Sequence, residues 1–163
     1  MSRIYFANAL FTQAEQEFNQ KVVNLIREKT QFSVYLPQEN LAINDKTNFA
    51  DSLKIYAADK SELDQADVLV AVLDGLTIDN GVCTEIGYFA ALNKPIIGLF
   101  TDVRKMYDFG QEKKKAEMLT VLGESQFAYI NLFVVGAVKA NGVLVASVDE
   151  LIDALNNNKY VKK

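Results

Sequence analysis

The feature that most constrains the fold is a continuous apolar run at residues 68–73. A strand that is apolar on both faces is typical of a parallel sheet whose two sides are covered by helices. Further segments have the length and apolar pattern of strands, at residues 3–7, 32–36, 95–100 and 143–146. The sequence therefore predicts a mostly parallel sheet of about five strands.

Helical patterns fill the segments between these strands. Thr12 and Glu15 have the spacing of a capping box ahead of a helix that runs to about Lys29. Other expected helices start near residue 48 with Phe49, Leu53, Tyr56 and Ala57 on one apolar stripe, span residues 82–93, lie near residues 114–122, and follow a cap at Ser147. Residues 130–137 fit either a strand or a buried helix. The alternation predicts a single doubly wound α/β domain, flavodoxin-like or Rossmann-like, over residues 1–163.

Histidine is absent from the sequence, and cysteine occurs once, as Cys83. Imidazole zinc sites, thiolate metal clusters, disulfides within the chain and nucleophiles that need a histidine base are therefore excluded. Residues 7–12, the first turn between a strand and a helix, contain no glycine, so neither a dinucleotide fingerprint nor a P-loop fits there. We expect an enzyme without a metal or a cofactor, which relies on carboxylates, tyrosines and lysines.

The formal net charge is -4 at pH 7, the pI is about 4.9, and most basic residues are scattered. This charge distribution lacks the basic patch of a nucleic-acid-binding protein. No apolar run approaches the roughly 18 residues that a membrane-spanning helix needs. The opening Met-Ser-Arg leads directly into a strand pattern, without the features of a signal peptide. We expect a cytoplasmic protein with no nucleic-acid or membrane partner.

The most informative carboxylate is Glu85, in the helix expected after the third strand. At about 100° per residue, Glu85 falls beside the apolar stripe of Val82, Ile86 and Phe89. A carboxylate that faces the core needs hydrogen bonds or a helix N-terminus to stabilise its charge, and a first-turn position would supply both. Glu85 therefore fits an anionic nucleophile in a cleft or, alternatively, an ordinary first-turn acid with its head in solvent.

Other candidate residues also have ordinary alternatives. Asp74 and Asp79 lie in a glycine-containing loop, where acids often form turns or cap helices. Asp59 lies on the flank of a helix stripe, as a solvated residue would, and Tyr5 fits a strand residue of the core. Phe11 fits either a hydrophobic staple or a wall on which a ring stacks. Two loop carboxylates in a small-molecule cleft suit protonation of a leaving group and attack on an anomeric carbon.

These elements coincide in a pattern that resembles the nucleoside 2-deoxyribosyltransferase family over most of the chain. Tyr5 and Phe11 match the family's first strand and aromatic pocket wall, and Asp59 matches its base-contacting aspartate. Asp79 and Glu85 match its loop aspartate and the nucleophile of its Glu-[Leu/Ile/Val]-Gly motif. The resemblance implies the family's doubly wound fold and an enzyme that acts on deoxynucleosides.

A further match is the segment Ile130-Asn131-Leu132-Phe133. It resembles the segment that a neighbouring subunit inserts into the site, where the family commonly has Asn-Leu-Met. The resemblance implies that Asn131 reaches an adjacent site, near the sugar 5'-hydroxyl or the nucleophile, in a dimer or a hexamer built from dimers. Phe133 replaces the common methionine, and together with Phe11 it would wall the pocket against water. The base preference is not implied.

The resemblance also implies a ping-pong exchange between deoxynucleosides and free purine or pyrimidine bases. Glu85 would attack C1' and form a covalent deoxyribosyl-enzyme, while Asp79 carries a proton to and from the base nitrogen. Tyr5 would orient Glu85 through its hydroxyl, and Asp59 would help to hold the base. Inversion at C1' in both steps gives net retention.

Two other functions stay open at this point. A hydrolase of the same superfamily, which cleaves 2'-deoxynucleoside 5'-monophosphates, wants glycines, serines or an arginine around the phosphate. The glycine-free turn at residues 7–12 disfavours that N-glycosidase. A non-catalytic flavodoxin-like binding module would share the fold, since a fold does not fix a function. The coincidence of two acids with the amide of Asn131 favours the transferase.

Overall fold

The computed structural model describes residues 2–40, 51–106 and 130–157. The helix expected near residues 114–122 and the stripe residue Phe49 lie outside the described residues. Within the described ranges, strands and helices alternate along the chain, as the sequence predicts.

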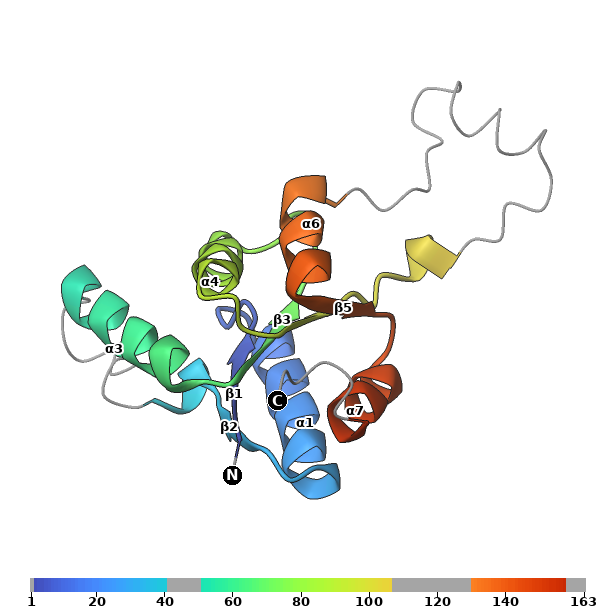
Figure 1. The fold of residues 1–163 in the computed structure, drawn as a ribbon, viewed down its shortest axis with the longest axis horizontal. Coiled ribbons are helices and arrows are strands. Elements are labelled where there is room, and N and C mark those ends of the chain that lie inside the picture. Colours follow the sequence, from blue (N-terminus) through green and yellow to red (C-terminus); the bar gives the residue numbers. More distant parts are fainter. Residues whose placement is uncertain (1, 41–50, 107–129, 158–163) are drawn as a thin grey trace.

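The centre of the fold is a five-stranded sheet in which all neighbouring strands run parallel (Figure 1). The strands are β1 (Arg3–Ala7), β2 (Ser33–Tyr35), β3 (Val68–Val72), β4 (Ile96–Leu99) and β5 (Gly142–Val145). Their order is β2-β1-β3-β4-β5, so the chain forms β2 on one side of β1 and then β3 on the other. The sheet is doubly wound, as predicted, and its switch point lies between the carboxyl ends of β1 and β3.

Helices cover both faces of this sheet. They are α1 (Gln13–Lys29), α3 (Ser52–Gln65), α4 (Asn80–Ala91), α6 (Leu132–Asn141) and α7 (Val148–Asn156), with the short 3-10 helices η1 (Pro37–Glu39) and η2 (Val103–Met106). α1 and α7 lie together on one face, and α4 and α6 lie side by side on the other (Figure 1). None of the helices in the described ranges combines the length and the apolar character that crossing a membrane requires.

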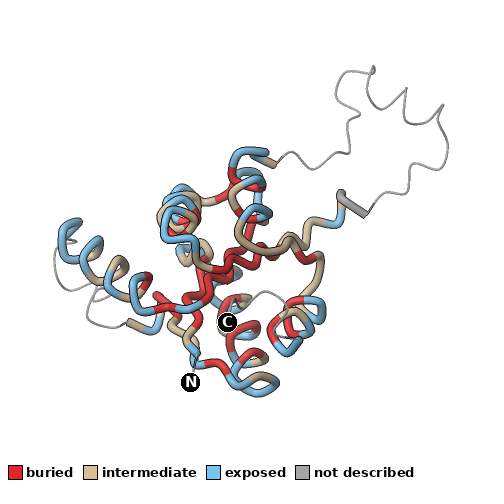
Figure 2. The backbone as a smooth tube through the Cα atoms, viewed as in Figure 1, coloured by how far each residue is buried: buried red, intermediate tan, exposed pale blue. Residues whose placement is uncertain are grey.

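Side chains alternate across the sheet and divide the core into two layers. Along β1, Ile4 and Phe6 join the layer beneath α1 and α7, whereas Tyr5 and Ala7 join the layer beneath α4 and α6. Figure 2 shows that the buried positions follow the strands and the inner sides of the helices. Tyr5 therefore points from the sheet toward the layer that contains α4.

The start and the end of α6 settle an alternative that the sequence leaves open. Residues 130–137 are not a strand: a helix begins at Leu132, behind the N-cap Asn131. The helix runs directly into β5 at Gly142, where an added Cβ would lie 1.9 Å from the carbonyl oxygen of Ile96. Only glycine allows the two strand backbones to approach so closely.

The apolar stripe predicted for α3 is wrong where the structure describes it. The helix begins at Ser52, and Leu53 and Tyr56 are 78% and 64% exposed. The first turns of α3 project outward, and the helix joins the core near its C-terminal end, at Leu63 (Figure 1). The physical reason is that docking of this end turns Asp59, rather than the apolar stripe, toward the sheet.

Candidate active site

The candidate site lies at the carboxyl edge of the sheet. Because the strands pair in parallel, the segments that follow β1, β2, β3 and β4 all leave the sheet on this side. Side chains from β1, α3 and α4 meet there, beside the switch point where ligands bind in doubly wound folds.

Glu85 lies on the inner side of α4, next to a stripe in which Val82, Ile86 and Phe89 are all buried, as predicted. Its Oε1 accepts a hydrogen bond of 2.6 Å from the hydroxyl of Tyr5. Tyr5 is fully buried, so it is a core residue and at the same time the hydrogen-bond partner of this carboxylate. The bond joins the first strand to a helix 80 residues further along the chain.

The helix begins at Asn80 rather than at Val82, which places Glu85 in its second turn. The predicted stabilisation of Glu85 by the first turn of the helix is therefore wrong, because the unpaired N–H groups belong to the residues before it. The hydroxyl of Tyr5 takes their place as the donor. Burial and the charge of Glu85 raise the pKa of Tyr5, so Tyr5 stays protonated and able to donate.

Several negative charges surround Glu85. The pKa of Glu85 is raised to about 7, mainly by burial; the hydrogen bond from Tyr5 opposes this rise, and the charges of Asp59 and Asp79 add to it. Near neutral pH the carboxylate is thus substantially ionised but poorly solvated. A group in this condition has the basicity and reactivity expected of a nucleophile or a general base.

Asp79 is the N-cap of α4. Its Oδ1 accepts hydrogen bonds from the backbone N–H groups of Gly81 at 2.8 Å and Val82 at 3.1 Å. Asp79 therefore caps a helix, as one of the two roles expected from the sequence requires. Its charge nevertheless acts on Glu85. Asp79 therefore caps the helix and also belongs, with Glu85 and Asp59, to a group that we call the carboxylate cluster.

Asp59 faces inward from α3, which argues against the alternative of a solvated residue. Its Oδ1 is buried and accepts no hydrogen bond from the residues that the structure describes. Burial raises the pKa of Asp59, and the charge of Glu62 adds to the rise. Because a buried polar atom without a partner costs about 1–3 kcal/mol, this oxygen is suited to a donor that a ligand supplies.

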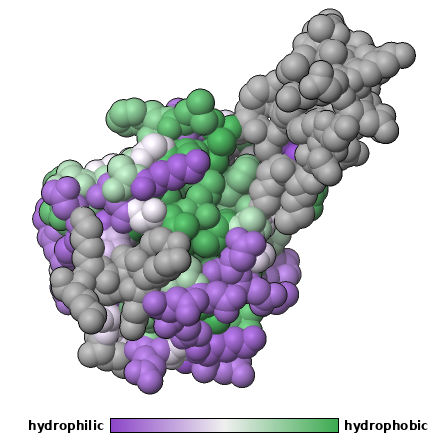
Figure 3. All heavy atoms as spheres, turned by 45° about the vertical axis from the view of Figure 1, so that its right-hand side comes forward, coloured by the Kyte–Doolittle hydropathy of each residue, from purple (hydrophilic) through white to green (hydrophobic). Residues whose placement is uncertain are grey.

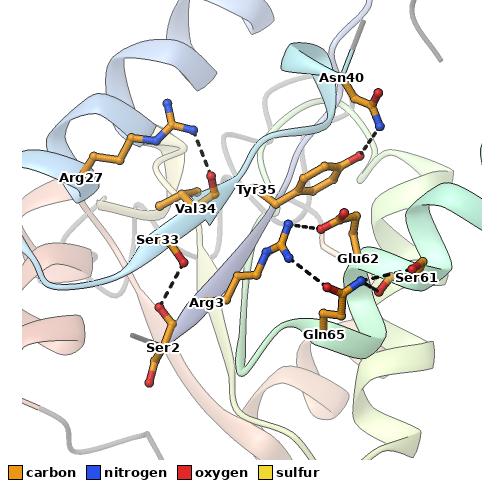
Figure 4. Close-up of polar contacts among 10 residues, drawn as sticks. All are labelled: Ser2, Arg3, Arg27, Ser33, Val34, Tyr35, Asn40, Ser61, Glu62 and Gln65. Carbon is orange, nitrogen blue, oxygen red and sulfur yellow. Dashed lines mark hydrogen bonds and ion pairs between the residues drawn. The ribbon is translucent and has the colours of Figure 1, made fainter. Parts of the chain in front are cut away.

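Arg3 fixes the end of α3 against the sheet, a contact that the sequence does not reveal. Its guanidinium points between two side chains of α3, pairing with Glu62 and donating to Gln65 at 3.2 Å (Figure 4). The backbone N–H of Arg3 also donates to Asp67, just after the helix, at 2.8 Å. These contacts set the position of Asp59, which lies one turn before Glu62.

Tyr35 closes the flank of the cluster on the β2 side, a position that the sequence pattern does not predict. Its ring centroid lies 5.3 Å from that of Tyr5, and its hydroxyl accepts a hydrogen bond of 3.1 Å from Asn40 (Figure 4). The sequence signal is an aromatic residue at the carboxyl end of a strand, shortly before Pro37. Its side-chain direction depends on the pairing of β2 with β1, which no local pattern specifies.

The other predicted site residues lie on the surface. Asn131 is exposed and caps α6 with its side-chain oxygen. Phe11 and Phe133 are 78% and 88% exposed, so Phe11 is not a hydrophobic staple, and Leu76 and Leu132 are exposed as well. Figure 3 shows apolar surface over the upper part of the molecule, the level at which α4 and α6 lie. Within the described residues of one chain, no hydrogen bond or ring contact joins Asn131, Phe11 or Phe133 to the carboxylate cluster.

Asp74 serves the loops rather than the cluster. Its carboxylate accepts from the backbone N–H and the hydroxyl of Thr101, each at 2.6 Å, and from the N–H of Asp102 at 3.1 Å. These bonds tie the segment after β3 to the segment after β4. Across the described ranges, no group of three or more histidine, cysteine or acidic side chains is arranged to hold a metal ion.

Comparison with known proteins places this chain in one family. The sequence profile described as Nucleoside 2-deoxyribosyltransferase matches residues 4–154. The chain belongs to the nucleoside 2-deoxyribosyltransferase family, whose members are enzymes. The matches to two curated relatives span 63% and 25% of the lengths of those relatives.

Solved structures share the fold. A conserved protein from Enterococcus faecalis V583 is 43% identical, with a TM-score of 0.87 and coverage of 95% of this chain and 97% of that one. A 2-deoxyribosyltransferase from Bacillus psychrosaccharolyticus is 17% identical, with a TM-score of 0.66 and coverage of 93% and 91%. A CMP N-glycosidase from Clostridium botulinum is 18% identical, with a TM-score of 0.50 and coverage of 93% and 96%. The last two similarities concern the fold alone.

The raised pKa of Glu85 predicts that this residue lowers stability at alkaline pH. The folded state holds the proton of Glu85 more tightly than the unfolded chain does. The contribution of this proton to the free energy of unfolding is therefore fully present below about pH 4.5 and is lost as the pH rises through about 7. Glu85→Gln keeps an acceptor for Tyr5 without the charge, so its free energy of unfolding should exceed that of the wild type by roughly 1–3 kcal/mol at about pH 8. Urea denaturation at several pH values measures this difference.

The difference should shrink toward zero as the pH falls to about 4.5. Glu17→Gln is the control, because Glu17 is exposed on α1 and its substitution should leave the pH dependence unchanged. Equal stability of Glu85→Gln and the wild type across the whole range would contradict the raised pKa.

Proposed function

We propose that this protein transfers a 2-deoxyribosyl group between nucleobases, through a covalent intermediate on Glu85. The observation that carries the proposal is the buried hydrogen bond of 2.6 Å between Tyr5 and Glu85, at the switch point of a chain from this family. A carboxylate that is poorly solvated and held in a fixed orientation is suited to attack an electrophilic carbon.

In the first half-reaction, an oxygen of Glu85 forms a bond to C1' of the deoxynucleoside, and the bond from C1' to the base nitrogen breaks. Asp79 relays a proton from the solvent to the nitrogen of the departing base and remains a carboxylate. In the second half-reaction, the nitrogen of a new base attacks C1', the ester bond to Glu85 breaks, and Asp79 relays the proton of the incoming base to the solvent. Two inversions give net retention at C1'. Tyr5 occupies Oε1 of Glu85, so the other oxygen is assigned to the attack.

The residues around the nucleophile have complementary roles in this proposal. The buried Oδ1 of Asp59, which lacks a donor among the described residues, accepts an N–H of the base. The exposed rings of Phe11 and Phe133 form walls on which a flat heterocycle stacks. Exclusion of water by these rings favours transfer to a second base over hydrolysis.

Contacts at two helix N-termini support a nucleoside rather than a nucleotide as the substrate. The N-terminus of a helix is a common phosphate site. Just before the first turn of α1, the backbone N–H groups of Phe11 and Thr12 donate to the carboxylate of Glu15, at 3.0 and 2.8 Å. Within the first turn of α4, the backbone N–H groups of Gly81 and Val82 donate to Asp79. A carboxylate at each position repels a 5'-phosphate, which disfavours the monophosphate N-glycosidase.

The site is completed by a second copy of the chain in this proposal. Asn131, at the start of α6, adjoins the exposed side chains of Leu132 and Phe133. Apolar side chains at the end of a helix are suited to a subunit contact. We assign the Asn131 amide to the 5'-hydroxyl, or to the surroundings of Glu85, in a neighbouring subunit of a dimer or a hexamer.

The exchange reaction tests the proposed function directly. Incubation with thymidine and adenine should yield deoxyadenosine and thymine, separated by chromatography, and Glu85→Ala should lower the rate at least about a thousandfold because the covalent catalyst is lost. Glu17→Ala is a matched control at an exposed glutamate. Free deoxyribose without deoxyadenosine would indicate hydrolysis, base release from thymidine monophosphate would favour the nucleotide hydrolase, and no reaction would favour a binding module.

The pH dependence of the exchange tests the ionised nucleophile. Because Glu85 must lose its proton before it attacks, kcat/KM should fall as the pH drops below about 7. In Tyr5→Phe this acid limb should move to higher pH, since the lost hydrogen bond lowers the pKa of Glu85 in the wild type. Tyr35→Phe, with its hydroxyl bonded to Asn40, is the control and should leave the limb in place. An acid limb that does not move in Tyr5→Phe would argue against Glu85 as the titrating group.

Mixing inactive subunits tests the placement of Asn131. Asn131→Ser retains a helix cap but lacks the amide, so it should fold and lose most activity. If Asn131 serves a neighbour's Glu85, hybrids of Asn131→Ser with Glu85→Ala contain one intact site, and an exchanged equimolar mixture of dimers should recover about a quarter of the wild-type rate. Subunits that carry two different labels verify that the dimers exchange their subunits. Complete exchange without recovered activity would place Asn131 in the site of its own chain.

A further inference from the structure

Asn19 is the polar residue of the described ranges that is almost wholly buried, with 1% of its surface exposed. It lies in the second turn of α1, between the helix and the carboxyl edge of the sheet. Its Oδ1 accepts from the Nδ2 of Asn8 at 2.7 Å, and its Nδ2 donates to the carbonyl of Ala9 and to the Oε1 of Gln38, both at 3.0 Å. Both donors of the amide are therefore used, on two different loops.

The loop between β1 and α1, residues 8–12, is held by side chains of α1 along its length. Asn19 binds the carbonyl of Ala9, and Gln16 donates to the carbonyl of Leu10 at 2.8 Å. Glu15 accepts from the two following N–H groups of the loop, at 3.0 and 2.8 Å. A loop whose backbone groups are bonded in succession has little conformational freedom, although this one contains neither glycine nor proline.

The same amide joins a second loop to the first. Gln38 belongs to η1, which follows β2, and it accepts from Asn19 while donating to the backbone carbonyl of Gln16 at 3.1 Å. Arg27 also pairs with Glu39 of η1, with an N–O distance of 2.7 Å. The loops after β1 and β2 are therefore fixed to the same helix, and Asn19 is the buried connection between them.

The backbone of residues 8–12 is held by hydrogen bonds, whereas the side chain of Phe11 in this loop extends into solvent. Phe11 is 78% exposed, so its ring contributes little to the core that the hydrogen bonds surround. We infer that Asn19 is a positioning residue for substrate binding, which holds the loop at residues 8–12 so that the ring of Phe11 is fixed at the rim of the site before the base arrives. This inference rests on the role proposed above for Phe11. A wall that is ordered in advance lowers the entropy cost of binding.

The order of the loop can be measured without any reaction, because the sequence contains no tryptophan. Phe11→Trp introduces the single indole of the chain at the rim, and its fluorescence can be excited separately from that of the tyrosines. Adding Asn19→Leu should raise the amplitude of the sub-nanosecond anisotropy decay of this indole at least about twofold, since the loop loses the bonds that hold it. Asn24→Leu is the matched control, because Asn24 is exposed on the same helix and bonds to Gln20. An unchanged decay in Asn19→Leu would overturn the inference.

Kinetics then separate positioning from a general loss of structure. In the protein that retains Phe11, Asn19→Leu should raise KM for the deoxynucleoside about tenfold and change kcat less than about twofold. The reason is that the ring of Phe11 binds the base equally well in the ground state and in the transition state. Asn24→Leu should change neither. A fall in kcat with an unaltered KM would contradict a positioning role in binding.

A second variant covers the case in which the buried substitution prevents folding. Gln16→Ala removes the surface hydrogen bond to Leu10 and leaves the core intact, so it should shift the anisotropy decay and KM in the same direction by about two- to threefold. If neither variant alters the decay, Asn19 is not a positioning residue. If the parent enzyme shows no exchange while both variants alter the decay, the proposed function fails and the ordering of the loop by Asn19 stands.

Discussion

The hydrogen bond between Tyr5 and Glu85 is the interaction on which the rest of the site depends. It places a carboxylate against the core, where Tyr5 is its one neutral donor among the residues that the structure describes and burial would otherwise drive the group to its uncharged form. A hydrogen bond to a charged group contributes about 1.5–3 kcal/mol, which offsets part of that desolvation. Because the donor comes from β1 and the acceptor from α4, the helix after β3, only the assembled sheet brings the two atoms together.

The residues around Tyr5 and Glu85 change from charged near the pair to apolar further out in the proposed site. Asp79 and Asp59 add negative charge near Glu85, yet each is constrained by a different part of the fold: one by capping α4, the other by the docking of α3 through Arg3. In the proposed site the outer boundary is formed by the exposed rings of Phe11, in the loop before α1, and Phe133, in the first turn of α6. Reactive carboxylates inside and apolar rings at the rim are the arrangement expected of a pocket that binds a flat, weakly polar ring.

The sequence predicts those parts of the molecule that depend on local periodicity. The buried run at residues 68–73, the stripe of Val82, Ile86 and Phe89, and the cap at Thr12 all specify elements that the structure contains. The alignment of Tyr5 with Glu85 follows from the family resemblance, since their separation along the chain encodes no contact. The inward direction of Asp59 and the contacts of Tyr35 and Asn19 depend on how elements dock, so no spacing rule reveals them.

The occupation of the helix N-termini by Glu15 and Asp79 has a consequence for selectivity. A pocket that rejects phosphorylated ligands by shape does so whatever the solvent, whereas rejection by fixed charge is an electrostatic effect. Ions screen such repulsion over roughly 8–10 Å at physiological ionic strength and more strongly in concentrated salt. For the proposed enzyme, discrimination between a nucleoside and its monophosphate would then depend on the medium, strongest in dilute buffer and weaker as the salt concentration rises.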